Sequence, residues 1–150
     1  MILALALTLA TSTTVVIPER RYDAQLVRVI DGDTLQVTVT ARAATRLPGQ
    51  DIVLSTSTVE TVRLAGVNAP EARGKCEAEK AAARAARLFL EERLRGTPLE
   101  LVTRGEEREK YSRVLADVQV GGKSVAAEMI ERGLAVPYHG EKRDPLAWCR

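Results

Sequence analysis

The stretch YDAQLVRVIDGDTLQVTVT, residues 22–40, decides the fold because two β-type segments meet there at a tight polar turn. Apolar and polar residues alternate over residues 22–30 and again over residues 35–40, and both segments are rich in Val, Leu and Thr. The intervening Asp31-Gly32-Asp33 has the composition of a hairpin turn. This pattern predicts a bent β-hairpin.

Three further segments favour strands. Residues 41–57 are mostly polar and contain a Pro-Gly pair, which predicts an extended hairpin excursion before residues 59–67 return as a strand. Residues 99–103 and 114–120 are rich in aliphatic side chains and predict two more strands. Together with the first hairpin, the chain is expected to form five strands.

Two segments favour helices. Residues 76–94 consist largely of strong helix formers, and Gly96 followed by Pro98 predicts where this long helix stops. Ser124 is suited to cap a short helix over residues 125–132. The apolar stripe expected on the long helix consists of Ala78, Ala82, Ala85 and Phe89.

Length and composition point to one folded domain. The chain has 150 residues and a hydrophobic content of 45%, which is ample for a core. Five strands with helices set against them predict an α+β fold, mainly β: a five-stranded OB-type barrel carrying one long and one short helix. The net charge of +2 is too small to indicate a polyanion binder, so any such attraction must come from local clustering.

The first eighteen residues differ from the rest of the chain. Residues 1–17 carry no charged side chain, and residues 2–10 form a compact apolar run. This resembles the apolar part of a secretory signal, without the usual basic start. We expect residues 1–18 to be a signal peptide or leader, residues 19–150 to be the domain, and the protein to be secreted or periplasmic. A disordered or strand-forming leader is the alternative, and a membrane anchor is less favoured.

The chain contains two cysteines, Cys76 and Cys149, and a single histidine. No CxxC spacing is present, which leaves little from which to build a zinc site. A disulfide is favoured, and in the chain-entropy model it would stabilise the fold by on the order of 4 kcal/mol. The alternative is two unrelated thiols.

Three short motifs carry the charges that metal-assisted phosphodiester hydrolysis requires. A carboxylate at a turn can hold a hard cation, a second carboxylate can activate water, and two arginines can neutralise a phosphate. Taken singly, each residue has a simpler explanation, such as a turn-forming Asp or a solvated Arg. Their coincidence favours the chemical interpretation. The motifs are Asp31-Gly32-Asp33-Thr34, RLAGVNAPE at residues 63–71, and Lys110-Tyr111-Ser112-Arg113.

Four ordered segments resemble the thermonuclease family typified by staphylococcal nuclease: VRVIDGDTL, VRLAGVNAPE, EKYSRVLADV and EMIERGLA. The resemblance runs from about residue 26 to residue 138. It implies an OB barrel with helices packed on it and a Ca²⁺-dependent phosphodiesterase that acts on DNA and RNA. Single-stranded substrates are favoured, and the protein is expected to be a monomer.

The resemblance also assigns roles to individual residues. It implies that Asp33 binds Ca²⁺ together with Asn68 and the backbone carbonyl of Ala69. Glu71 falls at the position of the carboxylate that activates or orients water. The remaining assignments are two phosphate-binding arginines, Arg63 and Arg113, and three nucleic-acid contacts, Lys110, Tyr111 and Tyr138.

The chain departs from the family pattern at two of these motifs. Asn68 stands where the family has Asp, so the predicted calcium site loses a negative charge and should bind the ion more weakly. Ser112 stands where the family has Gly, and serine is strained there if the position requires a positive φ. These departures favour an alternative in which the domain binds nucleic acid or protein with weak or absent catalysis.

Overall fold

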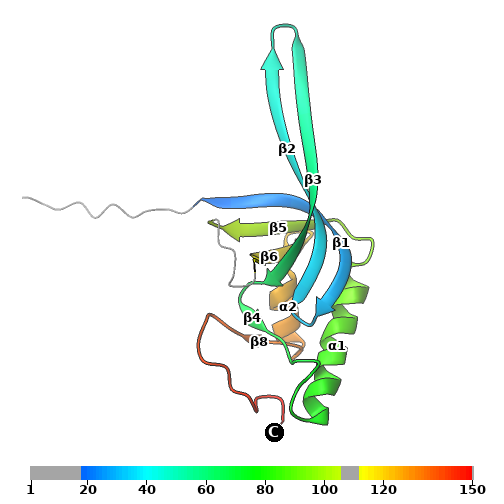
Figure 1. Ribbon diagram of the computed structural model, residues 1–150, viewed down its shortest axis with the longest axis vertical. Helices are drawn as coiled ribbons and strands as arrows, with labels where there is room; N and C mark the ends of the chain where they lie inside the picture. Colours follow the sequence, from blue (N-terminus) through cyan, green and yellow to red (C-terminus); the bar gives the residue numbers. More distant parts are fainter. Residues whose placement is uncertain (1–17, 106–111, 150) are drawn as a thin grey trace, which may run out of the picture.

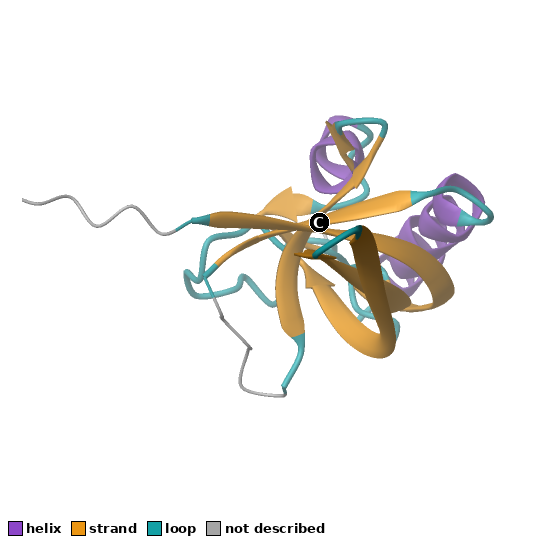
Figure 2. Ribbon diagram, turned by 90° about the horizontal axis from the view of Figure 1, so that it is seen from above, coloured by secondary structure: helices purple, strands orange, loops and turns teal. Residues whose placement is uncertain are grey.

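The computed structural model describes residues 18–105 and 112–149, and its centre is a closed ring of five strands (Figures 1 and 2). The ring contains β1 (Glu19–Asp31), β2 (Thr34–Leu47), β3 (Gln50–Leu64), β5 (Leu99–Arg104) and β6 (Val114–Val120). Strand β1 pairs with β2 and β5, β2 pairs with β3, and β5 pairs with β6. A parallel pairing between β3 and β6 closes the ring. The predicted OB-like, mainly β fold is confirmed.

The ring is filled by the aliphatic side chains that alternate along its strands. Leu35 and Val37 from β2, Val62 from β3 and Val118 from β6 are fully buried. Alternation places every second side chain on the inner face, and the period of two over residues 35–40 predicted this arrangement for β2. Three two-residue strands complete the β structure: β4 (Val67–Asn68), β7 (Lys123–Ser124) and β8 (Val136–Pro137).

The long helix α1 (Glu77–Leu94) begins one residue later than predicted, because Cys76 is its N-cap and accepts a hydrogen bond from the Glu79 N–H. The expected apolar stripe is wrong. The buried face of α1 consists of Glu79, Ala83, Ala86, Leu90 and Leu94. Alanines occur around most of the helix and fit several faces, so the burial of the two leucines decides which face packs on the ring.

The short helix α2 (Val125–Glu131) is capped by the Ser124 side chain, as predicted, and ends one residue before the expected boundary. An ion pair joins it to α1, with Arg93 Nε 2.9 Å from Glu128 Oε2. The hydrogen bond from Arg93 lowers the pKa of Glu128 below its usual range. Within the described residues, no helix is long and apolar enough to cross a membrane.

The excursion predicted for residues 41–57 is a continuous two-stranded arm. Strands β2 and β3 stay in register from the Thr34–Arg63 pair near the ring to the Leu47–Gln50 pair at the tip. Figure 1 shows the outer part of this hairpin projecting well beyond the body. The side chains of residues 41–51 are all exposed.

The turn between β1 and β2 packs tightly against two other parts of the fold. A Cβ added to Gly32 would lie 2.8 Å from the Cβ of Ala69 and 3.1 Å from the Cβ of Ala86. The absence of a side chain therefore lets the turn that carries Asp33 approach both α1 and the segment after β4.

Gly32→Ala should reduce the free energy of unfolding by about 1–3 kcal/mol, because the new methyl group overpacks this contact. Urea denaturation followed by circular dichroism measures the effect. Gly49→Ala is the comparison variant. Gly49 lies at the tip of the arm, where an added Cβ meets no atom within 4 Å, so its substitution measures only the cost of a side chain at a positive φ. A Gly32→Ala loss no larger than that of Gly49→Ala would contradict tight packing at the turn.

Candidate active site

Residues from three distant motifs converge on one cleft of about 550 Å³. Asp33 immediately precedes β2, Arg63 lies in β3, Glu71 follows β4 and Arg113 immediately precedes β6. Strand pairing explains the convergence, because Arg63 lies opposite Thr34 in β2 and opposite Leu115 in β6. The lining residues are Asp31, Asp33, Thr34, Arg63, Ala69, Pro70, Glu71, Ala72, Arg73, Arg113 and Arg143.

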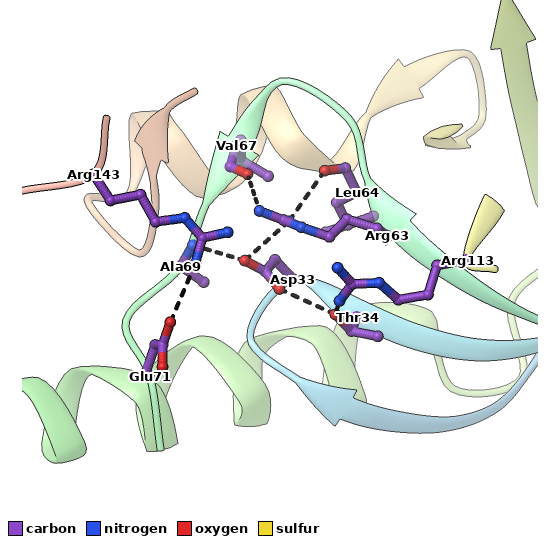
Figure 3. A network of polar contacts seen from close by, with 9 residues as sticks. All are labelled: Asp33, Thr34, Arg63, Leu64, Val67, Ala69, Glu71, Arg113 and Arg143. Atoms are coloured by element: carbon purple, nitrogen blue, oxygen red, sulfur yellow. Dashed lines mark hydrogen bonds and ion pairs between the residues drawn. The ribbon is translucent and has the colours of Figure 1, made fainter. Parts of the chain in front are cut away.

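A buried ion pair between Arg63 and Asp33 forms the floor of the site (Figure 3). Arg63 Nη1 lies 3.0 Å from Asp33 Oδ2, and their side chains are 3% and 15% exposed. Arg63 Nη2 also donates to the Val67 carbonyl at 3.2 Å. Asp33 accepts hydrogen bonds from the Ala69 N–H at 3.1 Å and from the Thr34 hydroxyl at 3.1 Å. These bonds fix both side chains before any ligand arrives.

Two further side chains, Arg113 and Glu71, line the cleft around this ion pair. Arg113 is partly buried, and its Nη1 donates to the Thr34 hydroxyl at 3.5 Å. Glu71 is far more open, with 64% of its side chain exposed, and its Oε1 lies 3.2 Å from Arg143 Nη1. The cleft therefore offers a fixed guanidinium, a second guanidinium beside it, and a solvent-accessible carboxylate.

The predicted metal ligands supply only oxygen, the atom that Ca²⁺ prefers. Asp33 and Ala69 line the cleft, and Asn68 is next to Ala69 in the chain, at the end of β4. The Asn68 Oδ1 atom is buried and has no hydrogen-bond partner among the described residues. A buried oxygen without a hydrogen-bond partner, one residue from the cleft-lining Ala69, fits a hard cation. Because Ca²⁺ takes six to eight ligands, water and substrate would have to complete the shell.

Glu79 supports the loop that carries Glu71, a role that the sequence analysis missed. Its buried carboxylate accepts hydrogen bonds from the Lys75 N–H at 2.9 Å and from the Glu71 N–H at 3.4 Å. Gly74 permits this approach, since an added Cβ would lie 2.4 Å from the Glu79 carboxylate. An acidic residue in the first turn of a helix is common, so the sequence offered no distinctive signal.

The predicted disulfide is confirmed. Cys76 and Cys149 are joined, with their Cα atoms 5.9 Å apart. Both sulfurs lie close to Glu79, and these three residues place their potential metal-ligand atoms within 4.8 Å of one another. Because the two sulfurs are bonded to each other, neither is a thiolate, and the group does not form a zinc site.

The predicted nucleic-acid contacts are only partly described. Lys110 and Tyr111 lie outside the described residues. Tyr138 lies beside the cleft: its backbone N–H donates to the Gly66 carbonyl at 2.9 Å, and its ring is 5.2 Å from the Arg143 guanidinium carbon. Arg143 and Arg73 are cleft residues that the sequence analysis missed, because both occur in charged stretches with no recognisable motif.

A family model described as staphylococcal nuclease homologue matches residues 61–146. The matched range covers more than half of the chain and includes Arg63, Glu71 and Arg113. The turn that carries Asp33 precedes it. No curated protein matches the chain significantly.

Ser112 has a φ of +58°, and among the described residues it is the one non-glycine residue with a positive φ. The position therefore requires the left-handed conformation, which is unfavourable for a residue with a Cβ.

Ser112→Gly should raise the free energy of unfolding by about 0.5–1 kcal/mol. Glycine relieves the backbone strain, but its greater freedom in the unfolded chain offsets part of this gain. Thermal and urea denaturation measure this change. A loss of stability would show that serine contacts outweigh the backbone strain.

Proposed function

The chain belongs to the family of staphylococcal nuclease homologues, and on this basis we propose that it is a Ca²⁺-dependent nuclease that hydrolyses phosphodiester bonds in DNA and RNA. Membership of the family indicates a nuclease-like or nucleic-acid-binding function. The observation that supports catalysis is that Asp33, Arg63, Glu71 and Arg113 all line one cleft. A site that only binds a polyanion would not need the carboxylates of Asp33 and Glu71 beside its arginines, because negative charges repel the ligand.

The arginines bind and neutralise the scissile phosphate in this proposal. A planar guanidinium can hold two phosphoryl oxygens, and the charge on those oxygens grows as water attacks. Arg63 is held by Asp33 and by the Val67 carbonyl, so it needs little reorganisation when the substrate binds. Arg113 binds the same phosphate from the β6 side.

Glu71 orients the attacking water and accepts its proton. Its exposure to solvent suits this role, because a water molecule must reach the carboxylate. Asp33, Asn68 and the Ala69 carbonyl would hold Ca²⁺, which supplies electrostatic stabilisation of the phosphate when bound. A ligand set with one carboxylate, itself paired with Arg63, should bind the ion weakly.

We also propose a secreted or periplasmic monomer that prefers single-stranded substrates. The disulfide and the apolar leader support an oxidising compartment. Open OB surfaces bind single strands through stacking and backbone charge, which supports the substrate preference. Asn68 favours the second candidate function, a nucleic-acid-binding domain without catalysis, because the family carboxylate is missing at that position.

Cleavage of single-stranded DNA should rise with Ca²⁺ and disappear with EDTA. Glu71→Ala should reduce the rate by about 10²–10⁴-fold, the usual contribution of a general base. The matched control is Glu92→Ala, an exposed position on α1 outside the cleft lining, which should leave the rate unchanged. Oligonucleotide binding without cleavage at any Ca²⁺ concentration would instead establish the binding domain.

Asn68→Asp should lower the Ca²⁺ concentration for half-maximal cleavage by about tenfold, because ligand charge is a main determinant of calcium affinity. It should also lower the melting temperature in EDTA, since a buried carboxylate then has no cation, and Ca²⁺ should restore it. Melting curves with and without Ca²⁺ provide a readout independent of catalysis. If Asn68→Asp leaves the calcium titration unchanged, Asn68 is not a ligand of the metal.

A further inference from the structure

The segment that follows β8 reaches the cleft through Arg143 and is anchored at both ends. We call residues 138–149 the C-terminal strap. Immediately before the strap, β8 pairs with β4, and at its first residue the Tyr138 N–H donates to the Gly66 carbonyl. At its end, Cys149 is bonded to Cys76, the N-cap of α1. Figure 1 shows the strap returning from β8 to the start of α1.

The strap has local order between its anchors. The His139 N–H donates to Glu141 Oε2 at 2.8 Å. The hydrogen bond from Glu141's own backbone N–H, and then the one from His139, lower the pKa of Glu141. Nearer the disulfide, the Leu146 N–H donates to Asp144 Oδ1 at 2.9 Å, and the Cys149 N–H donates to the Leu146 carbonyl at 3.0 Å. Two hydrogen-bonded turns therefore flank Arg143.

Arg143 extends from the strap into the cleft lining. Its Nη1 lies 3.2 Å from Glu71 Oε1, and its guanidinium carbon lies 5.2 Å from the centre of the Tyr138 ring. Figure 3 shows that it approaches from the side opposite Arg113, with Asp33 between the two. The cleft is thus bordered by guanidinium groups on both sides.

The charges of the cleft suggest what Arg143 does. Four arginines face three carboxylates in the lining, so removing Arg143 would leave equal numbers of each sign. The side chains of Arg143 and Glu71 are 43% and 64% exposed, and ion pairs this open contribute little to stability. Such a pair can separate at small cost when a phosphate offers Arg143 a better, bidentate partner.

We propose that Arg143 is a third phosphate-binding arginine of this cleft and that the Cys76–Cys149 disulfide holds it in place through the strap. The proposal rests on the proposed nuclease function and assigns to the site a residue outside the motifs. When a phosphodiester binds, Arg143 exchanges the Glu71 carboxylate for a phosphoryl oxygen. The exchange leaves Glu71 available to water.

Binding of a fluorescent single-stranded oligonucleotide with phosphorothioate linkages tests the role of Arg143 without turnover. Arg143→Ala should weaken binding about tenfold, equivalent to one charge-assisted contact, and Arg143→Lys should recover part of the loss. Lys142→Ala, which removes the neighbouring strap cation, should change binding less than about twofold, as expected for an exposed charge outside the cleft. In cleavage assays, Arg143→Ala should raise KM and change kcat much less. Equal effects of Arg143→Ala and Lys142→Ala would overturn the proposal.

The role of the disulfide is tested by non-additivity. Cys76→Ser/Cys149→Ser removes the bond while a serine hydroxyl still caps α1, and it should weaken binding by about as much as Arg143→Ala. Adding Arg143→Ala to this variant should cause little further loss, because the arginine is already displaced. Melting curves identify an assay temperature at which every variant is folded. Full additivity of the two changes would show that the disulfide does not act through Arg143.

The outcomes also separate this proposal from the proposed function. If the natural chain binds and cleaves single strands but Arg143→Ala behaves like it, the nuclease proposal stands and the role of Arg143 is wrong. If the natural chain neither binds nor cleaves, the proposed function fails and the inference fails with it.

Discussion

The buried ion pair between Arg63 and Asp33 is the constraint on which the site depends. Removing two charges from water is costly, and the cost is offset only where geometry is good and the remaining polar atoms are bonded. Here the Ala69 N–H, the Thr34 hydroxyl and the Val67 carbonyl provide those bonds. The pair therefore fastens the β1–β2 turn to β3 and to the segment after β4, which brings the first two motifs together. The parallel pairing of β3 with β6 adds Arg113 of the third motif. The ion pair also lowers the negative charge that Asp33 offers to a cation, since part of that charge is already balanced by Arg63.

A second set of contacts fixes the position of Glu71. The loop between β4 and α1 is held by the buried Glu79 carboxylate, and the disulfide at Cys76 ties the same place to the end of the strap. The beginning of α1 thus supports the side of the cleft that carries Glu71, while the strands support the side that carries Arg63 and Arg113. This division explains how an exposed carboxylate keeps a defined location on a loop.

Much of this arrangement could be predicted from the sequence because its signals are local. Alternation identified the first two strands of the ring and aliphatic composition the other three, and Gly96 with Pro98 identified the end of α1. The face of α1 was mispredicted because alanine fits either a buried or an exposed position, so the pattern lacked contrast. Glu79 and Arg143 were missed for a different reason. Their roles arise from contacts over eight and seventy-two residues, and charged side chains in charged stretches give no hint of such partners.

The projecting β2–β3 hairpin has a consequence for how this protein can vary. Its residues pair one to one along the whole arm, and in the described chain β1 accompanies β2 only as far as Thr40. Removing or inserting matched pairs of residues near the tip would preserve which side chains face inward within the ring. The arm can therefore change in length by matched pairs of residues without disturbing the interior of the ring. Deletion of one residue from a single strand would shift the register and exchange the inward and outward side chains of that strand.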